Sequence, residues 1–392
     1  MMSRTLPEPV ATCPRSYSRQ RSASGSVTLA GVAQSGVILA GACATACAAP
    51  AQRVDASAAE ARDAAVTPSG GAASPGGGPS PRDASPAPAH DAAAPGALIR
   101  GMCWNPVPIG SRHPEGLDYA GFAARDIPLM AALGVNVIRT YEPLLDRGVL
   151  DALWASGIRV IDSVYPWGGV EPSVVIERVR AVADHPAILY FSVGNEWNYN
   201  GLYVGLSHDE ALARIAEAAR LIHAEDDRHP VATIYGELPS AETIAALSDV
   251  DIWGINAYRG ISFGDLFDRW RELSGLPMFV AEYGADAFNA ALPGYDPDSQ
   301  ALAVVALTRE LLDQAVSERS SGRVLGGTLF EWADEWWKDE AGRPDAQDVG
   351  GIAPGGGPYP DQVFNEEWWG VVDIERNRRP TFGRLRAVFD EF

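Results

Sequence analysis

Residues 188–197 read ILYFSVGNEW, an apolar run that stops at Gly194 and is followed by an amide, a carboxylate and an indole. A near-continuous apolar run of this length is typical of a parallel strand that is covered on both faces. The polar groups that follow it would then lie at the carboxyl end of the strand. We therefore take Asn195 and Glu196 as the first candidates for a functional site.

Seven further strand-like runs lie around this one in the chain, and amphipathic helical stretches fill the gaps. The predicted strands are 98–104, 135–140, 158–165, 188–196, 231–235, 251–258, 277–283 and 325–331. The predicted helices include 118–133, a helix opened by a capping box at 207–210, 263–274, 300–319 and 380–392. Eight β/α units in one domain predict a (β/α)8 barrel. The alternative, an open doubly wound sheet, lacks the glycine-rich nucleotide-binding loops that would support it.

The first hundred residues differ from the rest in composition. Residues 48–97 contain no aromatic residue and no Leu, Ile or Met, so they have too little apolar surface to offset their ordering entropy. We predict an export signal over 1–47, a disordered linker over 48–97 and the barrel over 98–392. Cys43 and Cys47 directly follow the apolar part of the signal. They indicate either a lipoprotein-type cleavage site, with a lipid anchor to the membrane, or an ordinary small-residue site in an exported protein.

The net charge of the chain limits the classes of partner that it is expected to bind. The formal net charge is −20 at pH 7, which argues against nucleic acid or an anionic membrane surface and suits a neutral or cationic ligand. Cys103 is the one cysteine of the predicted barrel, so we expect no disulfide framework. We expect a monomer that needs no cofactor. We also expect no metal site, because the histidines show no paired metal-ligand spacing. An acidic stretch after the last strand is interpreted as a surface loop in preference to a calcium site: Asp334, Glu335, Asp339 and Glu340.

In a (β/α)8 barrel the carboxyl ends of the strands and the following loops converge on one mouth. The predicted last residues, in strand order, are Trp104, Arg139, Tyr165, Glu196, Tyr235, Tyr258, Glu282 and Glu331. Glu196 at strand four and Glu282 at strand seven face each other across that mouth. Two carboxyl groups roughly 5–5.5 Å apart suit double displacement at the anomeric carbon of a sugar. Asn195 beside the acid suits the sugar 2-hydroxyl, although Gly194-Asn195 can also be plain turn chemistry.

The motifs GNEWN after strand four and VAEYG after strand seven resemble the acid/base and nucleophile signatures of the clan A retaining glycoside hydrolases. The resemblance extends over residues 98–392. It implies Glu196 as general acid/base with Asn195 beside it, and Glu282 as nucleophile. Within the clan, the sequence is most similar to the β-1,3-glucanosyltransferases, and next to the catalytic barrel of the β-galactosidase/β-glucuronidase family.

The same resemblance implies three supporting residues. Tyr258, in GINAY, matches a tyrosine that holds the nucleophile, and Arg139, in VIRTY, matches a basic residue that keeps the nucleophile ionised. Trp332, in FEWADEWW, matches an aromatic residue that floors the sugar subsite nearest the cut. Structural roles stay open beside these, since Arg139 could pair with a structural carboxylate and Tyr258 could cap the core. Glu331 either binds a sugar hydroxyl or forms an ion pair with Arg139 or Lys338.

Aromatic side chains are expected to complete a sugar-binding cleft, because indole faces pack against the C–H faces of sugar rings. Trp104 and Trp197 lie at predicted strand ends. Five further tryptophans lie in or around the loop of about 333–370: Trp332, Trp336, Trp337, Trp368 and Trp369.

The expected function is that of an exported retaining β-glycosidase or transglycosylase that acts on a β-glucan or related oligo- or polysaccharide. Glu282 would attack the anomeric carbon, and Glu196 would protonate the leaving oxygen. The alternative is a non-catalytic carbohydrate-binding barrel at the cell surface. Such a protein would keep the aromatic cleft but would not need a pair of opposed glutamates.

Overall fold

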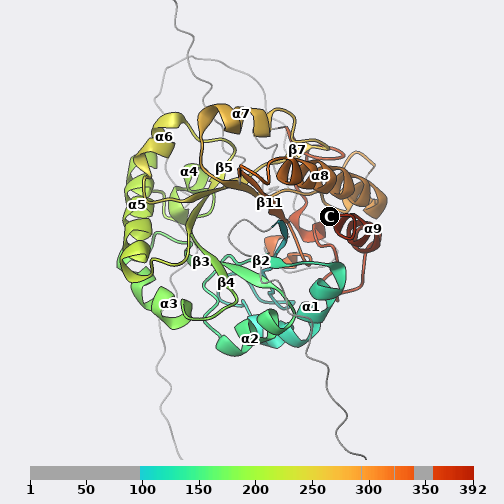
Figure 1. Cartoon of the computed structure of the whole chain (residues 1–392). Helices are drawn as coiled ribbons and strands as arrows, with labels where there is room; N and C mark the ends of the chain where they lie inside the picture. Colours follow the sequence, from blue (N-terminus) through green and yellow to red (C-terminus); the bar gives the residue numbers. More distant parts are fainter. Residues whose placement is uncertain (1–97, 293, 322, 340–355) are drawn as a thin grey trace, which may run out of the picture. The chain divides into compact units, whose positions relative to one another are not determined.

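Eight parallel strands close into one barrel, in the order β1-β2-β3-β4-β5-β6-β8-β11, with β11 paired to β1 (Figure 1). Their bounds are β1 Ile99–Cys103, β2 Val137–Arg139, β3 Arg159–Tyr165, β4 Ile188–Val193, β5 Val231–Gly236, β6 Ile252–Asn256, β8 Met278–Glu282 and β11 Val324–Leu329. Each corresponds to one of the eight predicted strands, so the (β/α)8 barrel is confirmed. The predicted strand four was too long, because β4 ends at Val193 and Glu196 belongs to the loop that follows.

This computed structural model describes residues 98–292, 294–321, 323–339 and 356–392. The predicted export signal and linker, together with Cys43 and Cys47, lie outside the described residues. In the described part of the chain, no helix has both the length and the apolar character that a membrane crossing requires.

Helices lie around the outside of the barrel (Figure 1). Their bounds are α1 Tyr119–Leu133, α2 Arg147–Ala155, α3 Val175–Val182, α4 Trp197–Asn200, α5 His208–Glu225, α6 Ala241–Ala246, α7 Leu266–Leu273, α8 Pro297–Ser317 and α9 Pro380–Phe389. Both predicted end signals are present. Gly134 closes α1 in the left-handed conformation, and Ser207 forms a capping box with Glu210 at the start of α5.

The remaining elements are short. Two-residue strands pair as β7 (Arg259–Gly260) with β12 (Gly357–Pro358), and β9 (Phe288–Asn289) with β10 (Gly294–Tyr295). Four 3-10 turns complete the described elements: η1 Pro172–Val174, η2 Gly201–Tyr203, η3 Trp336–Asp339 and η4 Glu366–Trp368.

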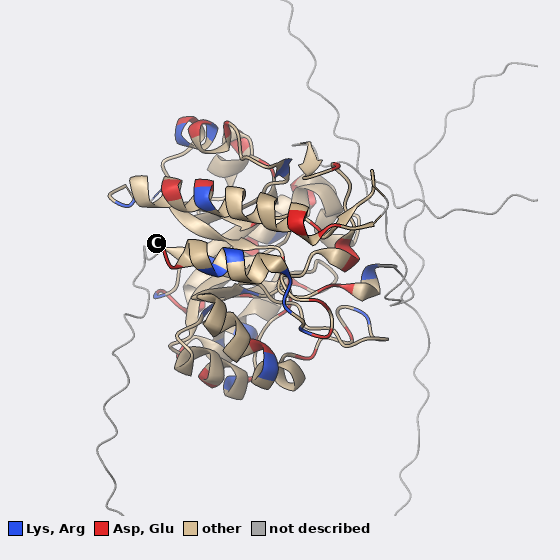
Figure 2. Ribbon diagram, turned by 90° about the vertical axis from the view of Figure 1, so that its right-hand side faces the viewer, with Lys and Arg blue, Asp and Glu red and all other residues tan. Residues whose placement is uncertain are grey.

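Apolar side chains fill two layers. The barrel interior holds side chains that alternate along the strands, such as Ile161, Ile234 and Phe279, and a larger layer packs the strands against the helices. Figure 2 shows that both signs of charge are spread over the outer helices. The apolar runs of the sequence are therefore buried on both faces, as the parallel strands require.

Two buried ion pairs fasten the chain that follows β11. Arg379 donates to both oxygens of Asp334 at 2.6 and 2.8 Å, and Arg376 donates to both oxygens of Asp126 in α1 at 2.9 and 3.0 Å. Trp104 Nε1 also donates to Asp126, at 3.0 Å. These contacts hold the loop after strand eight against the barrel, next to the ends of the strands.

Candidate active site

Glu282, the last residue of β8, receives hydrogen bonds from three side chains. Arg139 Nη1 and Tyr141 Oη each donate to Oε1 at 2.7 Å, and Tyr258 Oη donates to Oε2 at 2.9 Å. Arg139 ends β2 and Tyr258 follows β6, so three strands of one parallel barrel bring these groups to the same edge. The arrangement fixes the carboxylate in one orientation and balances its charge with the guanidinium.

Glu196 lies where β4 turns into α4, in a backbone conformation that follows from the glycine before it. Gly194 has φ +72°, and a Cβ there would lie 2.6 Å from Trp197 Cδ1, so only glycine fits. Glu196 itself is left-handed, with φ 46°, and its N–H donates to Ile234 O of β5 at 3.1 Å. This turn places a half-buried carboxyl group at the carboxyl end of the barrel.

The surroundings of Glu196 favour its protonated form. Burial, and then the charge of Glu282, raise the pKa of Glu196 to about 7, while a hydrogen bond with Asn256 acts in the opposite direction. The influence of Glu282 means that the two carboxyl groups share one environment. Glu196 can therefore hold a proton near neutral pH beside a carboxylate that is held by three donors.

Asn195 connects the two glutamates. Its Oδ1 accepts from Arg139 Nη2 at 2.6 Å and from Asn256 Nδ2 at 3.3 Å, and its Nδ2 donates to Tyr203 Oη at 3.1 Å. An amide nitrogen carries two N–H donors. One donor of Asn195 thus remains for a ligand, which is compatible with the predicted contact to a sugar hydroxyl.

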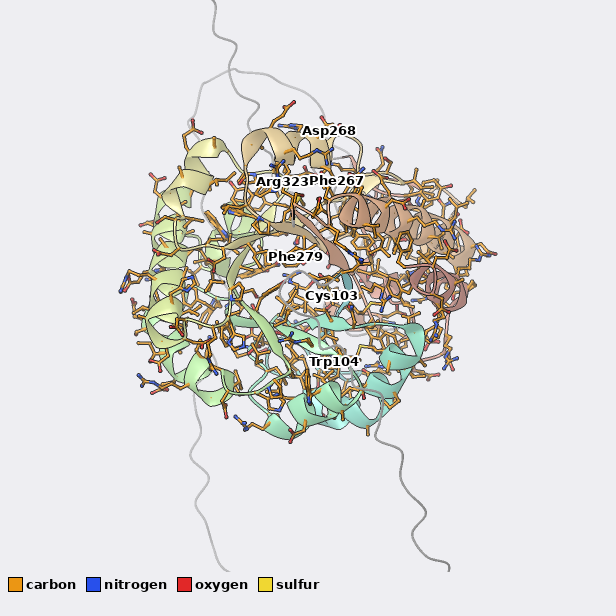
Figure 3. All side chains as sticks on the ribbon, in the orientation of Figure 1. Cys103, Trp104, Phe267, Asp268, Phe279 and Arg323 are labelled. Carbon is orange, nitrogen blue, oxygen red and sulfur yellow. The ribbon has the colours of Figure 1, made fainter. Side chains whose placement is uncertain are left out.

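Aromatic side chains gather beside Glu282. Tyr258, Phe330 and Trp369 form a cluster with Cys103, and Tyr141 and Phe364 pack against it. Figure 3 shows Cys103 near the middle of the barrel. Phe364 stacks on Trp369 with ring centroids 5.7 Å apart. This cluster is an apolar group beside Glu282, and only Tyr258 and Trp369 of its members were among the residues expected near the site.

Three predicted sugar contacts lie in the core instead. Trp104, Trp197 and Trp332 are at most 1% exposed and belong to the layer between strands and helices. Trp104 lies toward α1, as Figure 3 shows, and donates to Asp126 there, while Trp197 donates to Thr233 Oγ1 at 3.0 Å. All three lie just outside the strands, because Trp104 follows β1, Trp332 follows β11 and Trp197 begins α4, and each packs into the core around the barrel.

The loop after β11 carries a second polar cluster. Glu331 is 1% exposed, and burial, followed by the charge of Glu335, raises its pKa well above the ordinary value, so that a protonated Glu331 donates to Glu335. Lys338 Nζ lies 3.3 Å from Glu335 Oε2 and also pairs with Glu366. No ion pair joins Glu331 to Arg139 among the described residues, because Arg139 is taken by Glu282.

The acidic stretch after strand eight was expected at the surface, and this is wrong for two of its members. Asp334 and Glu335 are 4% and 2% exposed, because Arg379 binds Asp334 and Asn105 Nδ2 donates to Glu335 at 2.6 Å. Within the described ranges, no group of three or more His, Cys, Asp or Glu side chains is arranged to hold a metal ion.

The sequence analysis missed several residues of the site. Tyr141 lies two residues after Arg139, and Asn256 lies two residues before Tyr258. Side chains two positions apart on an extended segment share a face, so this spacing could have indicated both. Phe330, Phe364 and Glu366 carried no such signal, because their positions depend on how the loop after β11 folds.

The barrel resembles solved structures of glycoside hydrolases. A β-glucuronidase from Bacteroides uniformis matches with a TM-score of 0.53 at 18% identity, over 74% of this chain and 35% of that one. A GH2 β-galacturonidase from Eisenbergiella tayi, bound to galacturonate, matches with a TM-score of 0.51 at 18% identity, over 76% of this chain and 52% of that one. A β-D-glucuronidase from Dictyoglomus thermophilum matches with a TM-score of 0.52 at 18% identity, over 76% and 51%.

The chain thus spans between a third and about half of the length of these proteins. No protein family profile matches the sequence, and a search of curated proteins finds no match. At this level of identity, the similarity establishes the fold alone, which is a (β/α)8 barrel.

Proposed function

We propose that the protein is a retaining glycoside hydrolase that cleaves β-glycosidic bonds of an oligo- or polysaccharide. The observation that carries this proposal is the contrast between the two glutamates at the barrel mouth. Glu282 is held by three hydrogen-bond donors, whereas Glu196 has a pKa raised to about 7 by burial and by the charge of Glu282. Such a contrast is what a nucleophile and an acid in one site require.

In the first step a carboxylate oxygen of Glu282 attacks the anomeric carbon. The bond from that carbon to the leaving oxygen breaks, and the leaving oxygen takes the proton of Glu196. Arg139, Tyr141 and Tyr258 keep the attacking carboxylate in place. Asn195 offers its remaining N–H to the 2-hydroxyl of the sugar.

In the second step Glu196 acts as a base. It takes a proton from water or from the hydroxyl of an acceptor sugar, whose oxygen bonds to the anomeric carbon while Glu282 leaves. Two displacements at one carbon retain the β configuration. Hydrolysis and transfer share every step up to the acceptor, so transglycosylation belongs to the same proposal.

Azide rescue tests the two roles separately. Glu282→Ala should lower kcat by about 10⁴-fold or more, a loss on the scale that removal of a catalytic nucleophile causes in other enzymes. Azide should then restore turnover and give the α-glycosyl azide. Glu196→Ala with an activated leaving group should instead give the β-glycosyl azide. An inverted sugar as the first product of the wild-type protein, seen by NMR, would refute double displacement.

Glu217→Ala is a matched control, because Glu217 is a surface residue paired with Arg220 on α5. It should leave turnover unchanged. The alternative function, a binding barrel without chemistry, predicts sugar binding in calorimetry and no product with any substrate. Longer oligosaccharides formed from one defined substrate would show transfer beside hydrolysis.

A further inference from the structure

Lys338 is the only lysine in the sequence, although lysine and arginine together number 31. An ammonium is a compact point charge with three rotatable donors, whereas a guanidinium is a planar fork. The chain uses the ammonium at one place, in η3 of the loop after β11. That place adjoins the candidate active site.

Lys338 lies between two carboxylates and over an indole. Its Nζ is 3.3 Å from Glu335 Oε2, pairs with Glu366, and lies 4.9 Å from the centre of the Trp337 ring. The side chains of Lys338 and Glu366 are 28% and 30% exposed, so solvent reaches both. Within the described ranges, Glu335 Oε2 has no hydrogen-bond partner, so its contact with Lys338 is an ion pair alone. At least one of the three N–H donors of Lys338 therefore remains for a ligand.

This pair lies beside the catalytic glutamates. The charge of Glu366 is among the causes, after burial and the charge of Glu282, that raise the pKa of Glu196. Phe364, two residues before Glu366, and Trp369, three residues after it, contact the ring of Tyr258 with ring centroids 5.0 and 5.2 Å apart, and Tyr258 donates to Glu282. A sugar bound at Glu196 and Glu282 therefore lies within reach of the Lys338–Glu366 pair.

Carboxyl groups outnumber cations around this mouth. The carboxyl groups at the strand ends and in the adjoining loop are Glu196, Glu237, Glu282, Glu331, Glu335 and Glu366. The cations are Arg139, Arg259 and Lys338. Burial lowers the pKa of His113, which stacks on Trp337, to about 4, so it adds no charge at neutral pH.

Each of the three cations is engaged. Arg139 binds Glu282 and Asn195, and Arg259 binds Glu237 at 2.5 Å and Asp265 at 2.9 Å. Lys338 is held by two carboxylates. Among the described residues, each of these three cations is already paired with at least one carboxylate. The carboxylate of a uronic acid would therefore add to the negative charge of Glu237, Glu282, Glu335 and Glu366. Among the buried polar atoms without a partner in the described part of the chain, Glu331 Oε1 and Asn105 Oδ1 are acceptors, and the indole nitrogens of Trp336 and Trp337 are donors. Sugar hydroxyls both donate and accept, so they suit this combination.

We propose that Lys338 and Glu366 bind hydroxyl groups of the sugar at the catalytic glutamates, and that the site accepts β-glycosides of neutral sugars in preference to β-uronides. This inference rests on the glycosidase function proposed above. Lys338 would donate its remaining N–H to one hydroxyl, and Glu366 would accept from a neighbouring one. Both are then specificity-determining residues of the site.

The test compares 4-nitrophenyl glycosides that differ only in CH2OH or COO⁻ at C6: β-glucoside with β-glucuronide, β-galactoside with β-galacturonide, and β-mannoside with β-mannuronide. The wild-type protein should prefer the neutral member of the cleaved pair by about 100-fold in kcat/KM, since an uncompensated like charge costs several kcal/mol. Equal or faster cleavage of a uronide would overturn the inference while leaving the glycosidase function intact.

Two variants test the residues themselves. Glu366→Gln removes one negative charge and releases Lys338, so the uronide-to-neutral ratio of kcat/KM should rise by about tenfold. Lys338→Met should raise KM for the neutral substrate, and Lys338→Arg should restore it only in part. Glu217→Gln, a surface change, should leave the ratio unchanged. A ratio that Glu366→Gln does not move would count against the role of this pair.

A labelling experiment needs no variant to fold. Growth on lysine that carries ¹⁵N at Nζ labels only Lys338, the single lysine of the sequence, and keeps its three N–H donors. If no glycoside is cleaved, the proposed function fails, and this signal still tests the inference through binding. Neutral β-linked oligosaccharides should shift the Lys338 resonance and glucuronate should not. The reverse result, or no shift with any sugar, would overturn it.

Discussion

Glu282 and Glu196 are chemically identical side chains to which the barrel gives different surroundings. Glu282 accepts three hydrogen bonds, two on one oxygen and one on the other. Glu196 is paired with the amide of Asn256 and feels the charge of Glu282. In the mechanism that we propose, the division of work between nucleophile and acid is therefore set by neighbours on or just after strands β2 and β6, and not by the glutamates themselves.

Tyr141 should contribute to catalysis as strongly as the better anticipated Tyr258. Tyr141→Phe removes one donor to the nucleophile, and a hydrogen bond to a charged group is worth about 1.5–3 kcal/mol. We expect kcat to fall by roughly 10- to 100-fold, measured at saturating substrate. Tyr283→Phe is the matched control. Tyr283 directly follows Glu282 in the chain, but its hydroxyl group contacts Thr308 Oγ1 at 3.1 Å and not the carboxylate of Glu282. A Tyr141 variant with normal kcat would contradict this role.

The pH profile should report the proton on Glu196. Because its pKa is raised to about 7, Glu196 is protonated below that pH and loses the proton above it. The rate of the first step should therefore fall as pH rises through about 7. The hydrogen bond from Asn256 stabilises the carboxylate, so Asn256→Ala should move this alkaline limb to higher pH. Asn377→Ala, an exposed change near Asp373, should leave it in place.

Single residues of the site differed in how far the sequence could predict them. The resemblance of their motifs to those of the glycoside hydrolases implied that Arg139 and Tyr258 lie beside the nucleophile, and their predicted strand ends placed both on the same ring as Glu282. Trp332 was expected at the mouth and packs against Phe382 of α9, with ring centroids 6.5 Å apart. The strand itself can be predicted from the sequence. Whether an aromatic residue after its end faces the barrel mouth or the surrounding helices cannot.

At the scale of elements, the loop after β11 depends on a buried ion pair. Asp334 accepts from Arg379 through both oxygens and from Gly370 N at 3.0 Å. Asp334→Ala should lower the free energy of unfolding by about 3–5 kcal/mol, because it leaves a buried guanidinium unpaired. Asp390→Ala breaks the exposed pair with Arg386 and should lower the free energy of unfolding much less, because solvent screens that pair. Urea unfolding of both variants measures the difference; equal losses would contradict it.

The existence of the strands could be predicted from the sequence, whereas their ends could not. Near-continuous apolar runs identify parallel strands wherever they lie in the chain. The end of β4 depends on a distant contact, since Glu196 N donates to Ile234 O of β5 and draws the chain out of the strand direction. Gly194 was the local signal for this turn, and the packing of Trp197 against it explains the glycine.

At the scale of the whole molecule, the barrel is closed by its own first strand. β1 pairs with β2 on one side and with β11 on the other. Both neighbours lie after residue 98, so closure requires nothing from the predicted signal and linker. The pattern of eight apolar runs was enough to predict this architecture, because only a closed ring gives each parallel strand two neighbours.

Removal of residues 1–95 should therefore leave the barrel intact. We expect an unchanged Tm in calorimetry and unchanged kcat/KM on the substrate found for the full chain. Truncation to residue 104 is the control, because it deletes β1 and should prevent cooperative folding. A large drop in Tm for the shorter deletion would show that the leading segment contributes to the stability of the barrel.

The contact between the start and the end of the barrel has a practical consequence. Arg100 Nη1 donates to Phe389 O at 3.3 Å, so the first strand meets the last helix. Joining residue 392 to residue 98 by a short peptide would give a circular permutant, with new termini cut into an outer connection such as the one before α6. The eight β/α units could then be synthesised in a different order along the chain while keeping the same neighbours in the barrel.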